Sequence, residues 1–145
     1  MIDASRKRIL LVDDDPSIAE LVQLALPEYA VDVVSDAETA LVASRTAPPS
    51  LFIVDLILPG MRGTTLALLL RDEPLFSETP IFLLSGLIEA PSGESREPVR
   101  VNGFTAFGKP FQLEKLQTHV RLHIEEPENA QAALQALERG RIAGE

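Results

Sequence analysis

The amino-acid sequence predicts an α/β fold built on a parallel sheet with right-handed crossovers. Short apolar runs alternate with segments of helical periodicity along the chain, an order typical of parallel strands joined by helices. The runs are apolar throughout, as expected of strands buried on both faces. The length of 145 residues fits one domain with a short tail.

Helix caps, prolines and apolar runs place the elements in order. Asp15 is expected to cap the first helix, with Pro16 at its first position and Pro27 at its end. Ser35 or Asp36 opens the second helix, which closes before two prolines. The expected strands are 9–12, 30–34, 51–54, 80–84 and 104–107, and the later helices are 64–72 and 111–124.

One segment interrupts the alternation of strands and helices. Residues 87–102, between the fourth and fifth strands, contain Pro91, Gly93 and Pro98. Each proline removes a backbone donor and restricts the residue before it. We therefore expect a loop with at most one or two helical turns, where a fourth helix would otherwise stand.

Composition and charge exclude several classes of function. The chain has no cysteine, which excludes a disulfide scaffold, cysteine-ligated zinc, an iron–sulfur cluster and a cysteine nucleophile. Its 22 acidic and 13 basic residues give a net charge of −9, which argues against a nucleic-acid surface or a polybasic membrane contact. No stretch approaches the roughly 20 apolar residues of a membrane span, and no signal-peptide core is present. A cytoplasmic protein is expected.

Polar side chains follow four of the expected strands. In an open parallel sheet, ligands bind at the carboxyl ends of the strands. Crowded carboxylates there repel one another, and a hard cation with oxygen ligands such as Mg²⁺ relieves the repulsion. A carboxylate beside such an ion suits phosphoryl transfer as the nucleophile, with a lysine and a hydroxyl for the phosphoryl oxygens. The residues are Asp13 and Asp14, Asp55, Ser85 and Lys109, after the first, third, fourth and fifth strands.

Each of these residues also has an ordinary structural interpretation. A single aspartate after a strand is usually a turn former or a helix cap, as Asp15 is expected to be. A lone lysine such as Lys109 is more often solvated, and Ser85 with Gly86 makes an ordinary turn. Independent caps rarely place five such residues at one edge of a sheet, which favours a site.

The sequence around these residues resembles the receiver domain of the bacterial two-component response regulators. Any one of the matching pieces is weak, but the ordered set is highly specific, and it spans roughly residues 7–124. The pieces are residues 9–16 (ILLVDDDP), 54–63 (VDLILPGMRG), 84–86 (LSG) and 109–111 (KPF).

The resemblance implies a fold and a set of roles. The fold is a five-stranded doubly wound sheet of the flavodoxin-like type, in the order 2-1-3-4-5. Asp55 would accept a phosphoryl group from a sensor histidine kinase or phosphotransfer protein, Ser85 would supply a hydroxyl, and Lys109 would contact the phosphoryl group. Mg²⁺ would be held by Asp13, Asp14, Asp55 and the backbone carbonyl of Ile57.

The resemblance also implies a signalling module, not an enzyme, with a downstream protein as its target. Residues 1–124 would form the receiver domain. The tail 125–145 has alanines and leucines at helical spacing after Pro127, so an extra helix, a dimer contact and a linker are its three alternatives. A homodimer is accordingly left open.

The sequence departs from the family pattern at its readout positions. An aromatic residue usually lies three before the lysine, where this chain has Ala106. Phe104 shares a face with Ala106 while Phe107 points oppositely, so Phe104 substitutes, the strand shifts register, or no aromatic switch operates. Ile57 and Leu87, two residues beyond Asp55 and Ser85, have apolar side chains that cannot orient water. A long-lived phosphoryl state is expected.

Other interpretations remain open at this point. Residues 13–17 (DDDPS) also fit the D-x-D-x-S/T shape of haloacid-dehalogenase-like phosphatases, with Asp13 as nucleophile. A receiver-like scaffold that is not phosphorylated would instead bind its partner constitutively through an altered output face. In the family this face normally includes the fourth-helix region, which corresponds to residues 87–102 here. His119 and His123 stand four apart on the last helix, but without a third ligand they are expected to be a surface pair.

Overall fold

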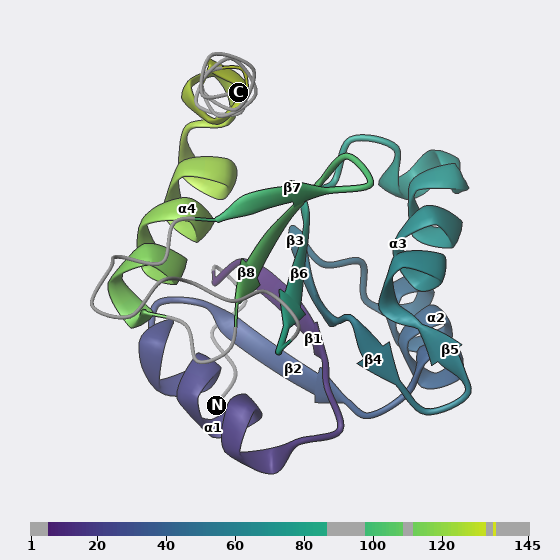
Figure 1. The fold of residues 1–145 in the computed structure, drawn as a ribbon. Helices are drawn as coiled ribbons and strands as arrows, with labels where there is room; N and C mark the ends of the chain where they lie inside the picture. Colours follow the sequence, from purple (N-terminus) through teal and green to yellow (C-terminus); the bar gives the residue numbers. More distant parts are fainter. Residues whose placement is uncertain (1–5, 87–97, 109–111, 133–134, 136–145) are drawn as a thin grey trace, which may run out of the picture.

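A six-stranded sheet runs through the middle of the molecule (Figure 1). This computed structural model describes residues 6–86, 98–108, 112–132 and 135. The sheet strands are β1 (Arg8–Val12), β2 (Ala30–Val34), β3 (Leu51–Asp55), β6 (Ile81–Ser85), β7 (Val99–Val101) and β8 (Phe104–Gly108). The other elements are α1 (Pro16–Ala25), α2 (Ala37–Thr46), the hairpin strands β4 (Ile57–Leu58) and β5 (Met61–Arg62), α3 (Gly63–Asp72), a 3₁₀ turn (Pro74–Phe76) and α4 (Leu113–Glu125).

The five parallel strands lie in the order β2-β1-β3-β6-β8. When these five parallel strands are numbered by themselves along the chain, their order is the predicted 2-1-3-4-5, so the predicted fold class is confirmed. Each strand is followed by a crossover before the next parallel strand, as a parallel pair requires. The strands β3, β6 and β8 are buried along their whole length, while the edge strand β2 is partly exposed.

Helices cover both faces of the sheet (Figure 1). Alternate residues of the strands point to opposite faces, so Ile9 and Leu11 pack with α1 and α4, while Leu10 and Val12 pack with α2 and α3. Each face therefore has its own apolar core. Runs that are apolar at every position satisfy both cores, which is why the central strands show no polar alternation.

The predicted helix starts are confirmed by their caps. The Asp15 side chain accepts a hydrogen bond from the Ser17 amide at 2.9 Å, and the Asp36 side chain accepts one from the Thr39 amide at 2.8 Å. The last helix begins at Leu113, two residues later than expected. Beyond it, residues 127–132 are helical and Ala130 is buried.

The segment expected to be a loop contains a strand, so that expectation was wrong for residues 99–101. Strand β7 pairs antiparallel with β8 and becomes the outer edge of the sheet. The turn between them is Asn102–Gly103, with φ angles of 50° and 83°, the conformation that two-residue hairpins require. Residues 87–97 lie outside the described part of the chain.

The last helix buries a histidine that was expected on the surface. His123 is 9% exposed, its Nδ1 lies 2.7 Å from the His119 carbonyl oxygen, and its ring meets the edge of Phe82 at 4.8 Å between centroids. Burial lowers the pKa of His123, and the positive charge of Arg100 lowers this pKa further, against the opposing effect of the hydrogen bond to His119. The imidazole is therefore held neutral at pH values where an exposed histidine titrates.

The free energy of unfolding is expected to fall as the pH drops below about 6.5, the usual histidine value. In that range the unfolded chain protonates position 123 while the folded chain does not, so protons favour the unfolded state. Urea unfolding at pH 7.5 and 5.5 measures the effect, and His123→Gln should show a smaller loss between the two. An identical pH dependence in the two proteins would contradict the prediction.

Among the described residues, no helix combines the length and the apolar character that crossing a bilayer requires.

Candidate functional site

Three carboxylates meet at the carboxyl edge of the sheet. Strands β1 and β3 are neighbours, and their register pairs Val12 with Val54. The next residues, Asp13 and Asp55, therefore lie side by side, and Asp14 joins them from the loop after β1. One carboxylate oxygen of each lies within 4.8 Å of those of the other two. The predicted convergence of Asp13, Asp14 and Asp55 is thus confirmed.

Hydrogen bonds hold the two buried carboxylates in place. Asp13 is 2% exposed and Asp55 is 7% exposed. The Asp13 amide donates to the Val34 carbonyl oxygen at 3.0 Å, and its side chain accepts from the Asp15 amide at 2.9 Å. The Asp55 Oδ1 accepts from the Ile57 amide at 3.2 Å. Both side chains are therefore oriented by the backbone of the loops that follow them.

The arrangement of donors fits a hard divalent cation. Two nearly buried carboxylates and an exposed third one repel one another at this distance, and burial weakens the screening by water. All three side chains offer oxygen, the ligand type that Mg²⁺ takes together with several waters. The exposure of Asp14 leaves one side of the cluster open to solvent, as retained waters need.

Of the two other residues predicted at strand ends, Ser85 and Lys109, the structure describes Ser85 and places it at the same edge. Ser85 ends β6 and is 1% exposed. Because β3 and β6 pair with Asp55 opposite Leu84, Ser85 lies one residue further along the neighbouring strand. Lys109 follows Gly108, the partner of Ser85 in β8, but Lys109 itself lies outside the described residues.

The loop after Asp55 is a hairpin that returns the chain to its starting point. The turn has Pro59 at its second position and Gly60, with φ of 76°, at its third, the signature of a type II turn. At the far end, the Gly63 amide donates to the Leu56 carbonyl oxygen at 2.8 Å. Helix α3 therefore begins directly beside the Asp55 loop. The two short strands that flank this turn, β4 and β5, were not among the expected elements.

Ile57 lies on this hairpin beside Asp55. Its side chain is 62% exposed and lines a shallow cleft together with Leu56, Leu58 and Arg62. Two residues beyond Asp55, the chain therefore presents an exposed apolar side chain. Leu87, on the other side, lies outside the described residues.

The aromatic residues of β8 lie on the faces that the sequence predicted. Phe104 and Ala106 face α2 and α3, and Phe107 packs on the opposite face against Phe82 at 5.3 Å between ring centroids. Phe104 is two residues before Ala106, which places it about 7 Å further from the carboxyl edge. The Cζ atom of the Arg71 guanidinium lies over the Phe104 ring, 5.8 Å from the ring centroid. Phe104 is thus displaced from the level at which the family has its aromatic residue.

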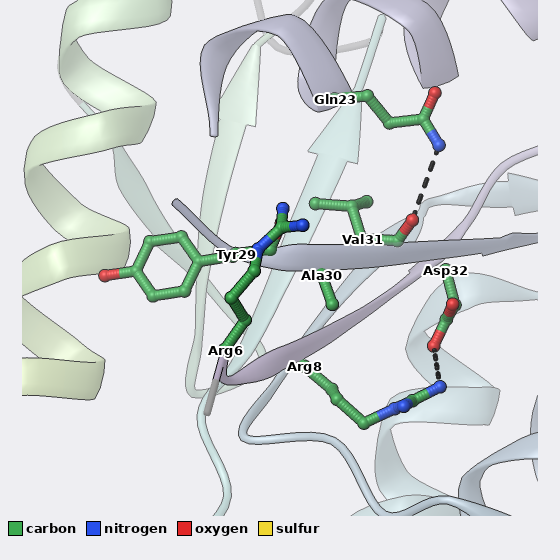
Figure 2. A pocket seen from close by; sticks show the side chains of 7 residues that line it. All are labelled: Arg6, Arg8, Gln23, Tyr29, Ala30, Val31 and Asp32. Atoms are coloured by element: carbon green, nitrogen blue, oxygen red, sulfur yellow. Dashed lines mark hydrogen bonds and ion pairs between the residues drawn. The ribbon is translucent and has the colours of Figure 1, made fainter. Parts of the chain in front are cut away.

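A separate cleft of about 360 Å³ lies at the other end of the sheet, beside the starts of β1 and β2 (Figure 2). Its cationic groups are engaged within the protein: Arg8 pairs with Asp32 at 2.7 Å, and Arg6 donates to the Pro27 carbonyl oxygen at 2.9 Å. Burial and the neighbouring Glu125 raise the pKa of Tyr29 to about 12. These contacts join β1, β2 and the end of α4, and they are remote from the carboxylates.

Comparison with known proteins gives one consistent family. The model of the response regulator receiver domain matches residues 9–121. The "DNA-binding response regulator MtrA" of Mycolicibacterium smegmatis is 33% identical over 135 residues, which cover 92% of this chain and 57% of that protein. The "Transcriptional regulatory protein TrcR" of Mycobacterium tuberculosis is 30% identical over 140 residues, covering 86% of this chain and 50% of that protein. The chain thus spans about half the length of these relatives.

Solved structures agree with the sequence relatives. A putative response regulator from Chloroflexus aurantiacus has a TM-score of 0.69 at 28% identity, covering 84% of this chain and all of that one. The chemotaxis response regulator CheY4 of Vibrio cholerae has a TM-score of 0.66 at 25% identity, covering 81% of this chain and 98% of that one. With the family match, the strand order and the acidic cluster in agreement, the chain belongs to the response regulator receiver domain family.

Proposed function

We propose that this chain is a phosphorylation-switched signalling module in which Asp55 accepts a phosphoryl group from a sensor histidine kinase or a phosphotransfer protein. The observation that carries the proposal is the meeting of Asp13, Asp14 and Asp55 within 4.8 Å at the carboxyl edge of a receiver-type sheet. Asp55 is the member of this cluster that ends a central strand, and the resemblance of residues 54–63 to the receiver domains implies that it is the acceptor.

Each residue of the site has a proposed role in the phosphoryl transfer. Asp13, Asp14, Asp55 and the backbone carbonyl of Ile57 would hold Mg²⁺, which would neutralise charge on the transferred group. The Ile57 amide donates to Asp55 Oδ1 and so orients the carboxylate. A carboxylate oxygen of Asp55 forms the new bond to phosphorus while the bond to the donor's leaving atom breaks. Ser85 would donate a hydroxyl hydrogen bond, and Lys109 would place a positive charge, on the phosphoryl oxygens.

For the output, we propose a downstream protein as the target. The match covers 57% and 50% of two relatives that are named as a DNA-binding and a transcriptional regulator. The net charge of −9 makes this chain itself poorly suited to a nucleic-acid surface. A homodimer remains a prediction.

Phosphodonor labelling in Mg²⁺ tests the proposed function directly. The protein is incubated with acetyl phosphate, and the labelled residue is mapped by mass spectrometry. Label at Asp55 is the expected result. Label at Asp13, with turnover of phosphate esters, would replace the proposal with the phosphatase alternative.

The phosphoryl group on Asp55 is expected to be long-lived, and Ile57→Asn should shorten its lifetime by about tenfold, since an oriented water reacts faster than a free one. The exposed Ile57 side chain cannot orient a water beside Asp55, whereas an amide in its place can. Loss of phosphate is followed after removal of the donor, with Ile57→Leu as the apolar control. Rapid loss from the wild type that is unchanged in Ile57→Asn would contradict the prediction.

A further inference from the structure

Gly63, the first residue of α3, makes an unusually close approach to the phosphoacceptor loop. A Cβ atom built on Gly63 would lie 2.8 Å from the Leu56 Cα and 2.9 Å from the Asp55 carbonyl carbon, and closer still to the Asp55 carbonyl oxygen. Real Cβ atoms essentially never show distances under 3.0 Å. All three neighbours are backbone atoms, which cannot rotate away as a side chain does.

The chain is built to bring Gly63 to this point. The β4–β5 hairpin folds back on itself through the turn at Gly60, and the Gly63 amide donates to the Leu56 carbonyl oxygen at 2.8 Å. On its other side, the Leu56 amide donates to the Leu84 carbonyl oxygen of β6 at 2.8 Å. The peptide between Asp55 and Leu56 is therefore held between the sheet and the first turn of α3.

Three other glycines, Gly60, Gly86 and Gly103, do not share this environment. Within the described part of the chain, a Cβ atom on any of the three would have no heavy atom within 4 Å beyond its chain neighbours. Gly60 and Gly103 have positive φ angles and serve turns. Gly86 has neither constraint, although it lies directly after Ser85. Among these four glycines, the close approach to backbone atoms is thus specific to Gly63 and to the Asp55 loop.

We propose that Gly63 is a positioning residue for phosphoryl acceptance, an inference that rests on the proposed function of Asp55. Asp13 is fixed by the end of β1 and by its bond to the Val34 carbonyl oxygen, so it does not follow if the Asp55 peptide moves. A side chain at position 63 forces α3 and that peptide apart and changes the distance between Asp55 and Asp13. A misplacement of about 1 Å at a reacting group costs on the order of 100-fold in rate.

The test compares Gly63→Ala with Gly86→Ala, which adds the same methyl group beside the site but into open space. Mg²⁺ affinity is measured by calorimetry, and the labelling rate with acetyl phosphate is measured at saturating Mg²⁺. Gly63→Ala is expected to weaken Mg²⁺ binding and to lower the labelling rate by about 10- to 100-fold. Gly86→Ala is expected to stay within about twofold of the wild type, since its methyl group meets nothing. A folded Gly63→Ala protein that binds Mg²⁺ and is labelled like the wild type overturns the proposal.

A second variant keeps the test decisive if Gly63→Ala does not fold. One glycine inserted after Gly60 lengthens the hairpin and releases the close approach without adding a side chain. This variant is expected to fold, because the insertion lies in an exposed turn, and to bind Mg²⁺ more weakly than the wild type. Wild-type affinity in the insertion variant overturns the proposal.

The same measurements separate this inference from the proposed function. A wild-type chain that binds Mg²⁺ but takes no label contradicts phosphoryl acceptance alone, and the affinities of the variants still decide the role of Gly63 in arranging the carboxylates. A wild-type chain that binds no Mg²⁺ overturns both.

Discussion

Asp55→Asn is expected to abolish labelling by acetyl phosphate in Mg²⁺. An amide has nearly the shape of the carboxylate but lacks its charge and its nucleophilic oxygen, so no acyl phosphate forms. Asp55 is 7% exposed and its Oδ1 accepts from the Ile57 amide, a hydrogen bond that the amide oxygen of asparagine can keep. The variant should therefore fold, and the loss of label should be complete.

The matched control for this substitution is Asp32→Asn. Asp32 lies on the edge strand β2, where it pairs with Arg8 at the surface and not with the carboxylate cluster. Asp32→Asn should be labelled at the wild-type rate. If Asp55→Asn takes up label at Asp13, the phosphatase alternative is supported. The scaffold alternative is supported by a different pair of results. The wild type takes no label from any donor, and the Asp55→Asn variant binds a partner as tightly as the wild type does.

The candidate site could be predicted from the sequence because its residues lie at the carboxyl ends of the sheet strands. Apolar runs that end in aspartate predict buried parallel strands, and the carboxyl ends of such strands share one edge. That geometry places Asp13 and Asp55 at one edge, and the strand order that the family resemblance implies makes their strands neighbours. The observed register, Val12 opposite Val54, is the one that makes them neighbours. Caps at Asp15 and Asp36 were predictable for a similar reason, since they depend only on the next three residues.

Strand β7 was missed because two local signals conflicted. The prolines of residues 87–98 indicate a loop, whereas the Asn102–Gly103 pair between Val101 and Phe104 is a strong signal for a hairpin that the loop prediction did not use. A three-residue strand cannot be identified from its own pattern. It forms because the open edge of β8 offers hydrogen bonds to it.

His123 and Gly63 mark a different limit of sequence-based prediction. His123 lies next to Ile124 on the buried side of α4, but only the three-dimensional structure shows that the His119 carbonyl satisfies its Nδ1 and makes burial tolerable. Gly63 follows a turn and looks like any other loop glycine in the sequence. Its close approach to the Asp55 peptide depends on the exact return of the β4–β5 hairpin, which no spacing rule encodes.

Asp13→Asn is expected to remove the stabilisation of the fold by Mg²⁺. An ion that binds only the folded state raises the free energy of unfolding by about 2.7 kcal/mol when its concentration is 100 times the dissociation constant. Asp13 is 2% exposed and lies within 4.8 Å of both other carboxylates, so its loss removes a central ligand and one of three charges. Urea unfolding with and without Mg²⁺ measures the stabilisation in each protein.

Asp15→Asn provides the control, because asparagine caps a helix as well as aspartate does. Asp15 caps α1 through the Ser17 amide and is not one of the three clustered carboxylates. The Asp15→Asn protein should therefore keep the Mg²⁺ stabilisation of the wild type, although it loses the same charge from the same loop. Equal loss in both variants would mean that Mg²⁺ responds to the overall acidity of the loop. Loss in Asp13→Asn alone ties the ion to the carboxylates that end β1 and β3, and labelling should then fall in the same variant.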